Sequence, residues 1–389
     1  MIGQEVLASR LPVRGFMKPD IYRQLQQHLD RMPVPFPATS SGVELRILRT
    51  LFTEEDAEVA LALSAAPESP RTIRRRLGRG WSLERLVAAI ESMAERGLIE
   101  RMRIKGTNRY SKSILAVGIY ERQLPRLTPE LQRDMEQYFN ESFGEAFHSV
   151  KPQQMRTVPV EIELTVEHPV TTYDDLRGFV ESNKGPFAVM DCICRNGKDL
   201  LGEPCRQTRL RSTCLTFGPA ARGMVDGGGA HFIEREEVLS ILTLADREGL
   251  VLQPQNTEQP LFVCCCCGCC CGVIRSAKQL PDPVSHFSAN YFAVVDGQAC
   301  AGCAMCEARC QMDAITMDDE AASVALERCI GCALCVTTCA TGAITLVPKT
   351  VAKKPARNTP ALYMQMYRER FGAYESAKAL AKAMLRLRV

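Results

Sequence analysis

The chain has 389 residues, and this length predicts two to four domains, each large enough to bury a core. Hydrophobic residues make up 46% and charged residues 24% of the sequence, values that exclude wholesale disorder and a fibrous architecture. The net charge of +3 conceals basic ends around an acidic middle: residues 1–120 carry +6, 121–295 carry −6, 296–347 carry −5 and 348–389 carry +8. This asymmetry favours docking to a partner.

The 19 cysteines all lie between Cys192 and Cys339, whereas a secreted disulfide protein is short and carries cysteines throughout. The N-terminus contains Glu5 and lacks the basic start and apolar run of a secretory signal. The longest apolar stretch, 261–274, is too short to span a membrane. We therefore expect a cytoplasmic protein with no transmembrane segment, whose reduced thiols hold metal rather than one another.

The expected fold class is α+β with several domains. Residues 1–43 are expected to form an N-terminal segment, with a short helix near 21–29 and then an extended linker, because three prolines within 32–37 exclude a helix. Residues 44–120 contain helix-start signals at Thr53 and Ser82 and end in a predicted β-hairpin. This order of short helices and a hairpin resembles bacterial winged helix-turn-helix modules.

Two functions are open for this winged-helix-like domain. As a DNA-binding module it would place the helix that begins at Ser82 in a groove, with hairpin residues such as Arg101 near phosphates. As a docking module it would bind protein. The second function is favoured, because the exposed face of that helix carries Glu84, Glu91 and Glu95, which phosphates would repel. DNA is therefore the less favoured partner.

Residues 121–291 are expected to form a cysteine-rich α+β domain. Its periodicity predicts a helix over 131–143, a buried strand over 186–190 and a helix over 234–247. A hairpin follows the last of these helices, and its second strand leads into a string of seven cysteines within eight residues, 264–271. This hairpin is a candidate second wing.

The strongest motif is the cysteine pattern CxxCxxCxxxC, which occurs twice at an offset of 29 residues. The first copy consists of Cys300, Cys303, Cys306 and Cys310, and the second of Cys329, Cys332, Cys335 and Cys339. Cysteines three apart can wrap three thiolates around one cubane, so eight thiolates predict two clusters. Structural zinc and disulfides are the alternatives, but zinc sites built from two cysteine pairs lack the third and fourth cysteine of each copy.

Residues 292–347 closely resemble the bacterial two-cluster ferredoxins. The usual sequence motif of that family is closely matched by Cys329-Ile-Gly-Cys-Ala-Leu-Cys-Val-Thr-Thr-Cys339. The resemblance implies two [4Fe-4S] clusters with crossed ligation. One cluster would be held by Cys300, Cys303, Cys306 and Cys339, and the other by Cys329, Cys332, Cys335 and Cys310. The chain departs from the family after each fourth cysteine, where Gln311 and Ala340 replace the usual proline. The local turn and the hydrogen bonds to sulfur are expected to differ there.

A second set of cysteines precedes the ferredoxin-like part. The candidate ligands of a further cluster or metal ion are Cys192, Cys194, Cys205, Cys214, Cys264, Cys266, Cys267, Cys269, Cys270 and Cys271. An unbroken strand would separate Cys265 from Cys271 by about 20 Å at roughly 3.3 Å per residue. Gly268 must therefore bend the chain, or different cysteines serve different sites. A thiol redox relay, lipid modification and simple burial are the alternatives to metal binding.

The order of these motifs resembles that of a largely uncharacterised family of winged-helix, cysteine-rich iron–sulfur proteins from anaerobic bacteria. The matching elements are Cys-x-Cys-Arg, Pro-Cys, Cys-Leu-x-Phe-Gly, the cysteine string and the two-cluster motif, and they extend over most of 44–347. The resemblance implies an architecture but no reaction, and it implies that Cys265 is dispensable. Thiols this dense oxidise readily, so an anoxic cytoplasm is expected.

Residues 348–389 are expected to form a basic C-terminal helix that starts near Thr359 and places Leu362, Met366, Tyr374 and Leu380 near one side. Packing of this helix on its own protein is favoured. The alternative is that its positive charge binds an acidic partner or a membrane surface.

Three functions are open for the whole chain. The favoured one is iron–sulfur electron transfer, which relays low-potential electrons to or from a redox partner such as a flavoprotein or an iron–sulfur oxidoreductase. The alternatives are a redox-responsive winged-helix transcription regulator and an iron–sulfur reductase with its active site at the central cysteines. No set of serine, histidine and acid can be assembled from the sequence, so the catalytic residues are unknown.

Overall fold

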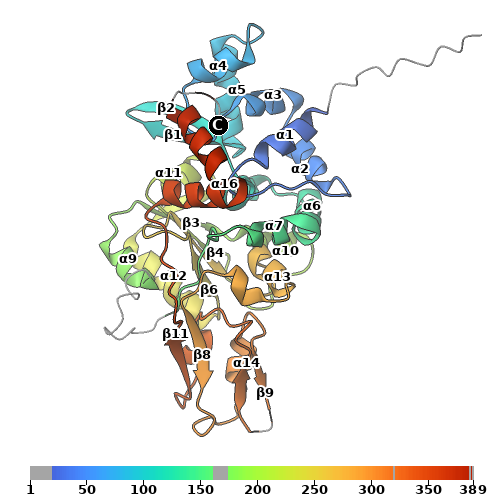
Figure 1. Cartoon of the computed structure of the whole chain (residues 1–389). Helices are drawn as coiled ribbons and strands as arrows, with labels where there is room; N and C mark the ends of the chain where they lie inside the picture. The colour runs from blue at the N-terminus through green and yellow to red at the C-terminus, as the bar shows by residue number, and fades with distance from the viewer. Residues whose placement is uncertain (1–19, 161–173, 319, 385–386, 388–389) are drawn as a thin grey trace, which may run out of the picture.

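The computed structural model describes residues 20–160, 174–318, 320–384 and 387. Helices and small sheets form three stacked parts, with the N-terminal helices at one end, a mixed helix and sheet part in the middle and two small sheets at the other end (Figure 1). The mixture agrees with the expected α+β class. No helix in these ranges combines the length and the apolar character needed to cross a membrane.

The N-terminal part consists of short helices and one hairpin. Its elements are α1 (Ile21–Leu29), α2 (Val43–Leu51), α3 (Glu54–Ala62), α4 (Pro70–Leu77), α5 (Leu83–Glu95), β1 (Ile99–Ile104) and β2 (Thr107–Lys112). The predicted helix starts at Thr53 and Ser82 are confirmed. Thr53 and Asp56 form a capping box, in which Asp56 N donates to Thr53 Oγ1 at 3.1 Å and Thr53 N donates to Asp56 Oδ2 at 2.8 Å.

The proline-rich segment after α1 is not helical, as its prolines require, but it bends at 32–34 and packs on the protein, so the prediction of an extended linker is wrong. Met32, Val34 and Phe36 are all buried in the core that α1 and α2 share. The Phe36 ring packs on Tyr138 of α6, with the ring centroids 5.2 Å apart. Pro33 and Pro35 are buried as well, so the whole stretch 32–36 is enclosed by the protein.

The first hydrophobic core continues past residue 120, where the sequence predicts a domain boundary. The next elements are η1 (Leu115–Ile119), η2 (Glu121–Arg126), α6 (Pro129–Tyr138), η3 (Phe139–Phe143) and α7 (Gly144–Ser149). Leu131 and Met135 of α6 are buried in the same core as Ile47 of α2. The segment that follows the hairpin therefore joins the N-terminal helices to the central part.

The central part is built on a five-stranded antiparallel sheet with the order β5-β3-β4-β7-β6. Its elements are α9 (Leu176–Ser182), β3 (Phe187–Asp191), α10 (Ile193–Leu200), β4 (Ser212–Phe217), α11 (Pro219–Asp226), β5 (Ala230–Ile233), α12 (Arg235–Arg247), β6 (Val251–Pro254), β7 (Phe262–Cys266) and α13 (Gly272–Lys278). The predicted hairpin is present as β6 and β7. It forms one edge of this sheet rather than a second wing.

Two two-stranded sheets follow, β11 with β8 and β10 with β9. The elements are η4 (Pro283–His286), β8 (Tyr291–Val295), α14 (Met305–Arg309), β9 (Ile315–Met317), β10 (Ala322–Val324), α15 (Leu334–Thr337) and β11 (Ile344–Pro348). Residues of these elements, such as Ile315 and Ile344, share a second hydrophobic core with Val189 and Val263 of the central sheet. The small sheets are thus packed on the central part.

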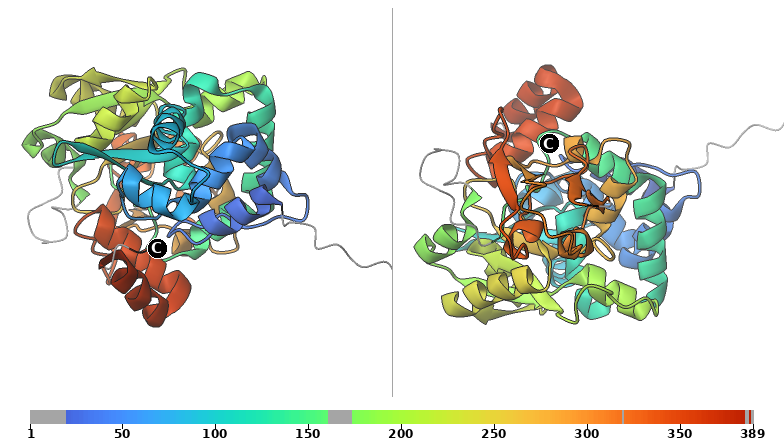
Figure 2. Two further views of the ribbon diagram at one scale, coloured as in Figure 1. Left: turned by 90° about the horizontal axis from the view of Figure 1, so that it is seen from above. Right: turned by 90° about the horizontal axis from the view of Figure 1, so that it is seen from below.

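The last helix, α16 (Thr359–Met384), projects beside the N-terminal helices (Figure 2). Its first half packs on the protein, because Leu362 and Met366 are buried in the first core. Gly372 has a φ of +81° and breaks the helix. The predicted single apolar side is therefore wrong beyond this point, where Tyr374 is 78% exposed.

Candidate metal centres

The central cysteines gather at one end of the five-stranded sheet. Because neighbouring strands are antiparallel, the end of β3, the start of β4 and the end of β7 lie at the same end of the sheet. Cys192 directly follows β3, Cys214 lies near the start of β4, and the cysteine string begins in β7. The topology of the sheet thus brings together cysteines that are up to about 80 positions apart in the sequence.

Four of these cysteines form a compact group, which we call the four-thiol group: Cys205, Cys267, Cys269 and Cys270. All four sulfur atoms lie within 4.8 Å of one another. The Cys205 sulfur is 3.7 Å from that of Cys267 and 3.6 Å from that of Cys269, which is 3.6 Å from that of Cys270. The group could hold a metal ion or cluster.

The spacing within the four-thiol group resembles that around a single tetrahedral ion. A metal–sulfur bond of about 2.3 Å places tetrahedral sulfur ligands about 3.8 Å apart. A cubane holds its thiolates farther apart, because four iron atoms lie between them. A tetrahedral set of four sulfurs is typical of zinc or iron.

Hydrogen bonds between the thiols prepare the four-thiol group for a cation. The hydrogen bond with Cys267 lowers the pKa of Cys205 to about 6. Hydrogen bonds with Cys205 and Cys267 also lower the pKa of Cys269. The same hydrogen bonds raise the pKa of Cys267 and Cys270, so the group favours two thiolates and two thiols, and a bound metal would displace the two remaining protons.

The turn that carries three of these four cysteines depends on Gly268. A Cβ atom at this position would lie 2.4 Å from the carbonyl oxygen of Gln311. Gly268 N donates a hydrogen bond of 2.7 Å to Gln311 Oε1. The strand ends at Cys266 and the chain turns at Gly268, so the sequence correctly predicts a bend here.

Only four of the ten predicted ligands therefore belong to this compact group. The six outside the four-thiol group, which we call the six-thiol group, are Cys192, Cys194, Cys214, Cys264, Cys266 and Cys271. Cys214 pairs directly with Cys264 across β4 and β7. Cys265 belongs to neither group, and burial raises the pKa of its thiol to about 12. The bend expected at Gly268 is present, whereas the use of different cysteines by different sites stays a prediction.

A buried arginine lies next to both groups, and the sequence analysis did not single it out. The side chain of Arg195 is fully buried, and it donates to Cys265 O at 3.1 Å and to Thr213 Oγ1. Burial acts to lower the pKa of Arg195, but the neighbouring thiols, first Cys192 and then Cys267, raise it. Its place directly after Cys194 in Cys-x-Cys-Arg is the signal that marks it.

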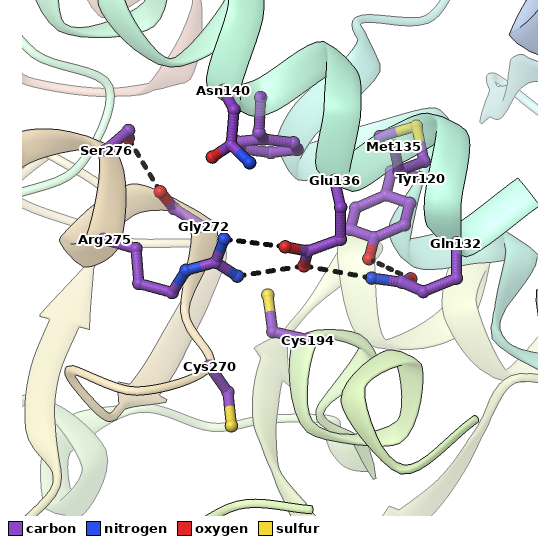
Figure 3. A pocket seen from close by; sticks show the side chains of 11 residues that line it. Tyr120, Gln132, Met135, Glu136, Asn140, Cys194, Cys270, Gly272, Arg275 and Ser276 are labelled. Carbon is purple, nitrogen blue, oxygen red and sulfur yellow. Dashed lines mark hydrogen bonds and ion pairs between the residues drawn. The ribbon is translucent and has the colours of Figure 1, made fainter. Parts of the chain in front are cut away.

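Both groups border one small cavity (Figure 3). Cys194 of the six-thiol group points its sulfur toward an ion pair between Glu136 and Arg275, whereas the sulfur of Cys270 points away from that pair. The Glu136–Arg275 ion pair has a length of 2.7 Å, and Lys198 lies 3.1 Å from the same carboxylate. Cationic side chains therefore surround the central thiols on this side as well.

The eight cysteines of the duplicated motif are more widely spaced. No three of them, all within the described ranges, bring their sulfur atoms within 4.8 Å of one another. Backbone amides reach two of the sulfurs, with Ala314 N donating to Cys310 Sγ at 3.2 Å and Ala293 N donating to Cys329 Sγ at 3.3 Å. Such bonds stabilise a thiolate.

The pKa shifts within the duplicated motif indicate which thiols interact with one another. Burial and the thiols of Cys300 and Cys303 raise the pKa of Cys306. Burial raises the pKa of Cys310 as well, but there the neighbouring thiol belongs to Cys329, in the second copy. Cys310 thus interacts with Cys329 of the second copy, and Cys306 with Cys300 and Cys303 of the first, although Cys306 also adds to the raised pKa of Cys335.

Gln311 connects the duplicated motif to the four-thiol group. Its side chain accepts a hydrogen bond from Gly268 N and donates one of 3.0 Å to Gln207 Oε1. Gln207 lies two positions after Cys205 in the chain. Proline in place of Gln311 has no such amide group. The departure from the ferredoxin pattern thus produces a contact between the two cysteine regions.

The predicted DNA-contacting surface is partly occupied by internal bonds. Glu91 of α5 accepts from Arg101 Nη1 at 2.8 Å, from Asn108 Nδ2 at 3.1 Å and from the Tyr110 hydroxyl. The hairpin is therefore fastened to the helix that would enter a groove, and Glu84 and Glu95 stay exposed on that helix.

Comparisons with models of protein families, with curated proteins and with solved structures found no match to this chain.

Proposed function

We propose that this chain is an iron–sulfur electron-transfer protein. Two [4Fe-4S] clusters are bound by the duplicated motif, and a further metal ion is bound by the four-thiol group. The ligands of the first cluster are Cys300, Cys303, Cys306 and Cys339, and those of the second are Cys329, Cys332, Cys335 and Cys310. The ligands of the metal ion are Cys205, Cys267, Cys269 and Cys270.

The observation that carries this proposal is a repeat of backbone conformation at the same 29-residue offset as the cysteines. Left-handed residues occur at three matched pairs: Gly302 and Gly331, Ala304 and Ala333, Asp313 and Gly342. Helices α14 and α15 also begin 29 residues apart. A left-handed alanine is uncommon and costs free energy, so its occurrence between cysteines of both copies indicates a shared constraint. Wrapping of three thiolates around one cluster supplies such a constraint.

The position of the four-thiol group supports a role in the same electron path. Gln311 follows Cys310 directly and contacts the turn that carries Cys267 and Cys269. An ion pair of 3.0 Å between Arg309 and Asp246 fastens the same segment to the end of α12. These contacts keep the duplicated motif close to the central cysteines.

The surface near the first cluster motif suits a basic redox partner. Cys303 is exposed, and the apolar side chains of Met305 and Leu326 are each 52% exposed. Residues 296–347 carry a net charge of −5. Exposed apolar side chains on an acidic part of the chain favour transient docking of a positively charged protein, because charge steers the encounter.

Anaerobic purification followed by iron and sulfide analysis tests the cofactor. The proposal expects about eight iron atoms and eight sulfides per chain from the duplicated motif, with EPR signals after reduction. Zinc without sulfide at these cysteines would contradict it.

A stopped-flow experiment tests electron transfer. The reduced protein should reduce a basic cytochrome at a rate that falls as the salt concentration rises. The variant Glu307→Lys, beside the exposed Met305, should slow this reaction several-fold. The matched variant Glu84→Lys on α5 should not. Equal rates in both variants, with no effect of salt, would contradict docking at this surface.

A further inference from the structure

The six-thiol group remains after every other cysteine has been accounted for. Its members come from the end of β3, the start of β4 and the two ends of the cysteine string. Cys264 and Cys266 share one face of β7, since side chains of a strand alternate, whereas Cys265 lies on the other face. The string therefore enters the six-thiol group in β7, crosses to the four-thiol group at Cys267 and returns at Cys271.

The six thiols lie in a row of neighbours. Cys214 pairs with Cys264 across β4 and β7, and Cys264 and Cys266 share one face of β7. From Cys266 the row continues through Cys271 and Cys194 to Cys192, because each of these thiols shifts the pKa of the next. Yet no three of these six described cysteines have sulfur atoms all within 4.8 Å of one another. A single ion cannot collect such an extended row, whereas thiolates that bridge neighbouring ions can.

Arg195 places a buried positive charge beside these thiols. Its side chain is fully buried, its Nε atom has no hydrogen-bond partner, and its two acceptors are a carbonyl and a hydroxyl. A buried guanidinium without a carboxylate is costly unless another anion lies beside it. The ionisable groups that act on its pKa include Cys192 and Cys266 from the six-thiol group and Cys267 from the four-thiol group. Neighbouring thiols and burial raise the pKa of these three, so a bound metal that deprotonates them would supply the counter-charge that neutral cysteines lack.

We propose that the six-thiol group binds a second central metal centre, a multinuclear iron–sulfur site separate from the ion of the four-thiol group. Six thiolates are more than one tetrahedral ion can use, so the centre holds at least two ions. Soft thiolate ligands select iron, zinc or copper(I), and of these zinc has no redox chemistry. The identity of the metal as iron rests on the proposed electron-transfer function, and the presence of the centre does not.

The cavity shown in Figure 3 gives this centre a polar border. Cys194 faces the ion pair of Glu136 and Arg275. Glu136 raises the pKa of Arg275, and the thiols of Cys194 and Cys271 raise it further. Arg275 is paired with Glu136, whereas the two printed acceptors of Arg195 are a carbonyl and a hydroxyl, so Arg195 supplies the positive charge that no carboxylate neutralises. This charge offsets part of the negative charge of a centre with six thiolate ligands.

A pair of neighbouring residues offers a matched test. Cys266 and Cys265 are both buried, and they point to opposite faces of β7. In the full chain, purified anaerobically, Cys266→Ser should lose at least one iron and part of the sulfide, and change the Mössbauer spectrum. Cys265→Ser should keep the wild-type metal content. Equal metal content in the two variants would overturn the proposal.

The wild-type protein supplies a second measurement that does not depend on a variant folding. Two cubanes and one ion in the four-thiol group account for about nine metal ions per chain. A metal content clearly above nine, with iron in excess, supports the six-thiol centre. A content of nine or fewer, with seven thiols (the six-thiol group and Cys265) free to react without removal of metal, would contradict it, and so would zinc in place of the extra iron.

The same samples separate this inference from the proposed function. Cys306→Ala and Cys310→Ala act on the duplicated motif and should leave the six-thiol centre in place. If the duplicated motif holds no cluster but Cys266→Ser still loses metal, the electron-transfer function fails and the six-thiol centre stands. If the clusters are present and Cys266→Ser matches Cys265→Ser, only the six-thiol centre fails.

Discussion

The two cysteine regions of this protein reach their arrangement by opposite means. In the duplicated motif, the eight cysteines lie within 300–339, and the spacing of three residues places three cysteines of each copy on one local stretch of chain. In the central region, the cysteines come from separate strands and loops, and only the antiparallel sheet brings them together. The first arrangement can be recognised in the sequence from the regular spacing of its cysteines, whereas the second depends on tertiary structure. Loss of one ligand should therefore have different consequences in the two regions.

The largest effect is expected when a ligand of the four-thiol group is removed. Cys205 comes from the loop between α10 and β4, and the other three ligands come from the cysteine string. Cys205→Ser should release the bound ion and destabilise the central part by several kcal/mol, because metal binding free energy becomes folding free energy. Metal analysis and thermal unfolding measure both effects.

The matched variant for this test is Cys265→Ser, which changes a buried cysteine outside both groups. It should keep the metal and unfold within a few degrees of wild type. If the two variants lose equal amounts of metal and stability, the division of the central cysteines is wrong.

A smaller effect is expected from acid, through a histidine that joins α7 to α13. His148 Nε2 lies 2.9 Å from Val273 O, and burial lowers the pKa of His148 to about 4. Protonation is therefore easier in the unfolded chain, whose histidine pKa is about 6.5. The stabilisation is complete above pH 6.5 and is lost as the pH falls toward 4, by about 3 kcal/mol in total.

Chemical unfolding between pH 4 and 8 measures this contribution. His148→Gln should remove most of the pH dependence in this window, whereas the exposed His231→Gln should retain it. An unchanged slope in His148→Gln would show that the contact between α7 and α13 does not couple the central part to pH.

The contact between the two cysteine regions can be tested at Gly268. A Cβ atom here would lie 2.4 Å from Gln311 O, so Gly268→Ala should cost about 1–3 kcal/mol and separate the two regions. Gly223→Ala is the control, because no atom lies within 4 Å of a Cβ at that helical position. Its stability should stay level or rise slightly. If the two variants have equal free energies of unfolding, the turn at Gly268 accommodates a Cβ atom without a loss of stability.

The smallest effect is expected on redox potential. Arg195 holds a positive charge beside both thiol groups, and positive charge favours the more negative, reduced state of a metal centre. Arg195→Gln should lower the midpoint potential of the central centres by about 60 mV, which corresponds to about 1.4 kcal/mol for one electron. Arg195→Lys should shift it less. If a potentiometric titration shows no shift, the charge of Arg195 does not affect the midpoint potential of the central metal centres.

The sequence predicts best the features that depend on neighbouring residues. The capping signal at Thr53 and the hairpin of β6 and β7 are present where the local pattern places them. The 29-residue repeat is visible in the sequence and again in the backbone at Ala304 and Ala333. Each of these features is determined within a few residues, so local reasoning finds it.

Features that depend on distant contacts were missed. The segment 32–37 contains the residues of a linker, but its apolar side chains find partners on α6, about a hundred residues away. The division of the cysteine string into two groups needs the register of β7 against β4 and the position of Cys205. The role of Gln311 requires knowledge of Gly268 on another turn. No local pattern contains this information.

The central claim is that the duplicated motif binds two clusters with crossed ligands, and Cys310 tests it most directly. The EPR spectra of reduced Cys306→Ala and Cys310→Ala should each keep one cluster signal and lose the magnetic interaction between two clusters. The surviving cluster should differ: Cys306→Ala should keep the cluster of Cys329, Cys332 and Cys335, and Cys310→Ala should keep the other. Damage to the same cluster in both variants would show that each copy of the motif binds its own cluster, and would contradict the account.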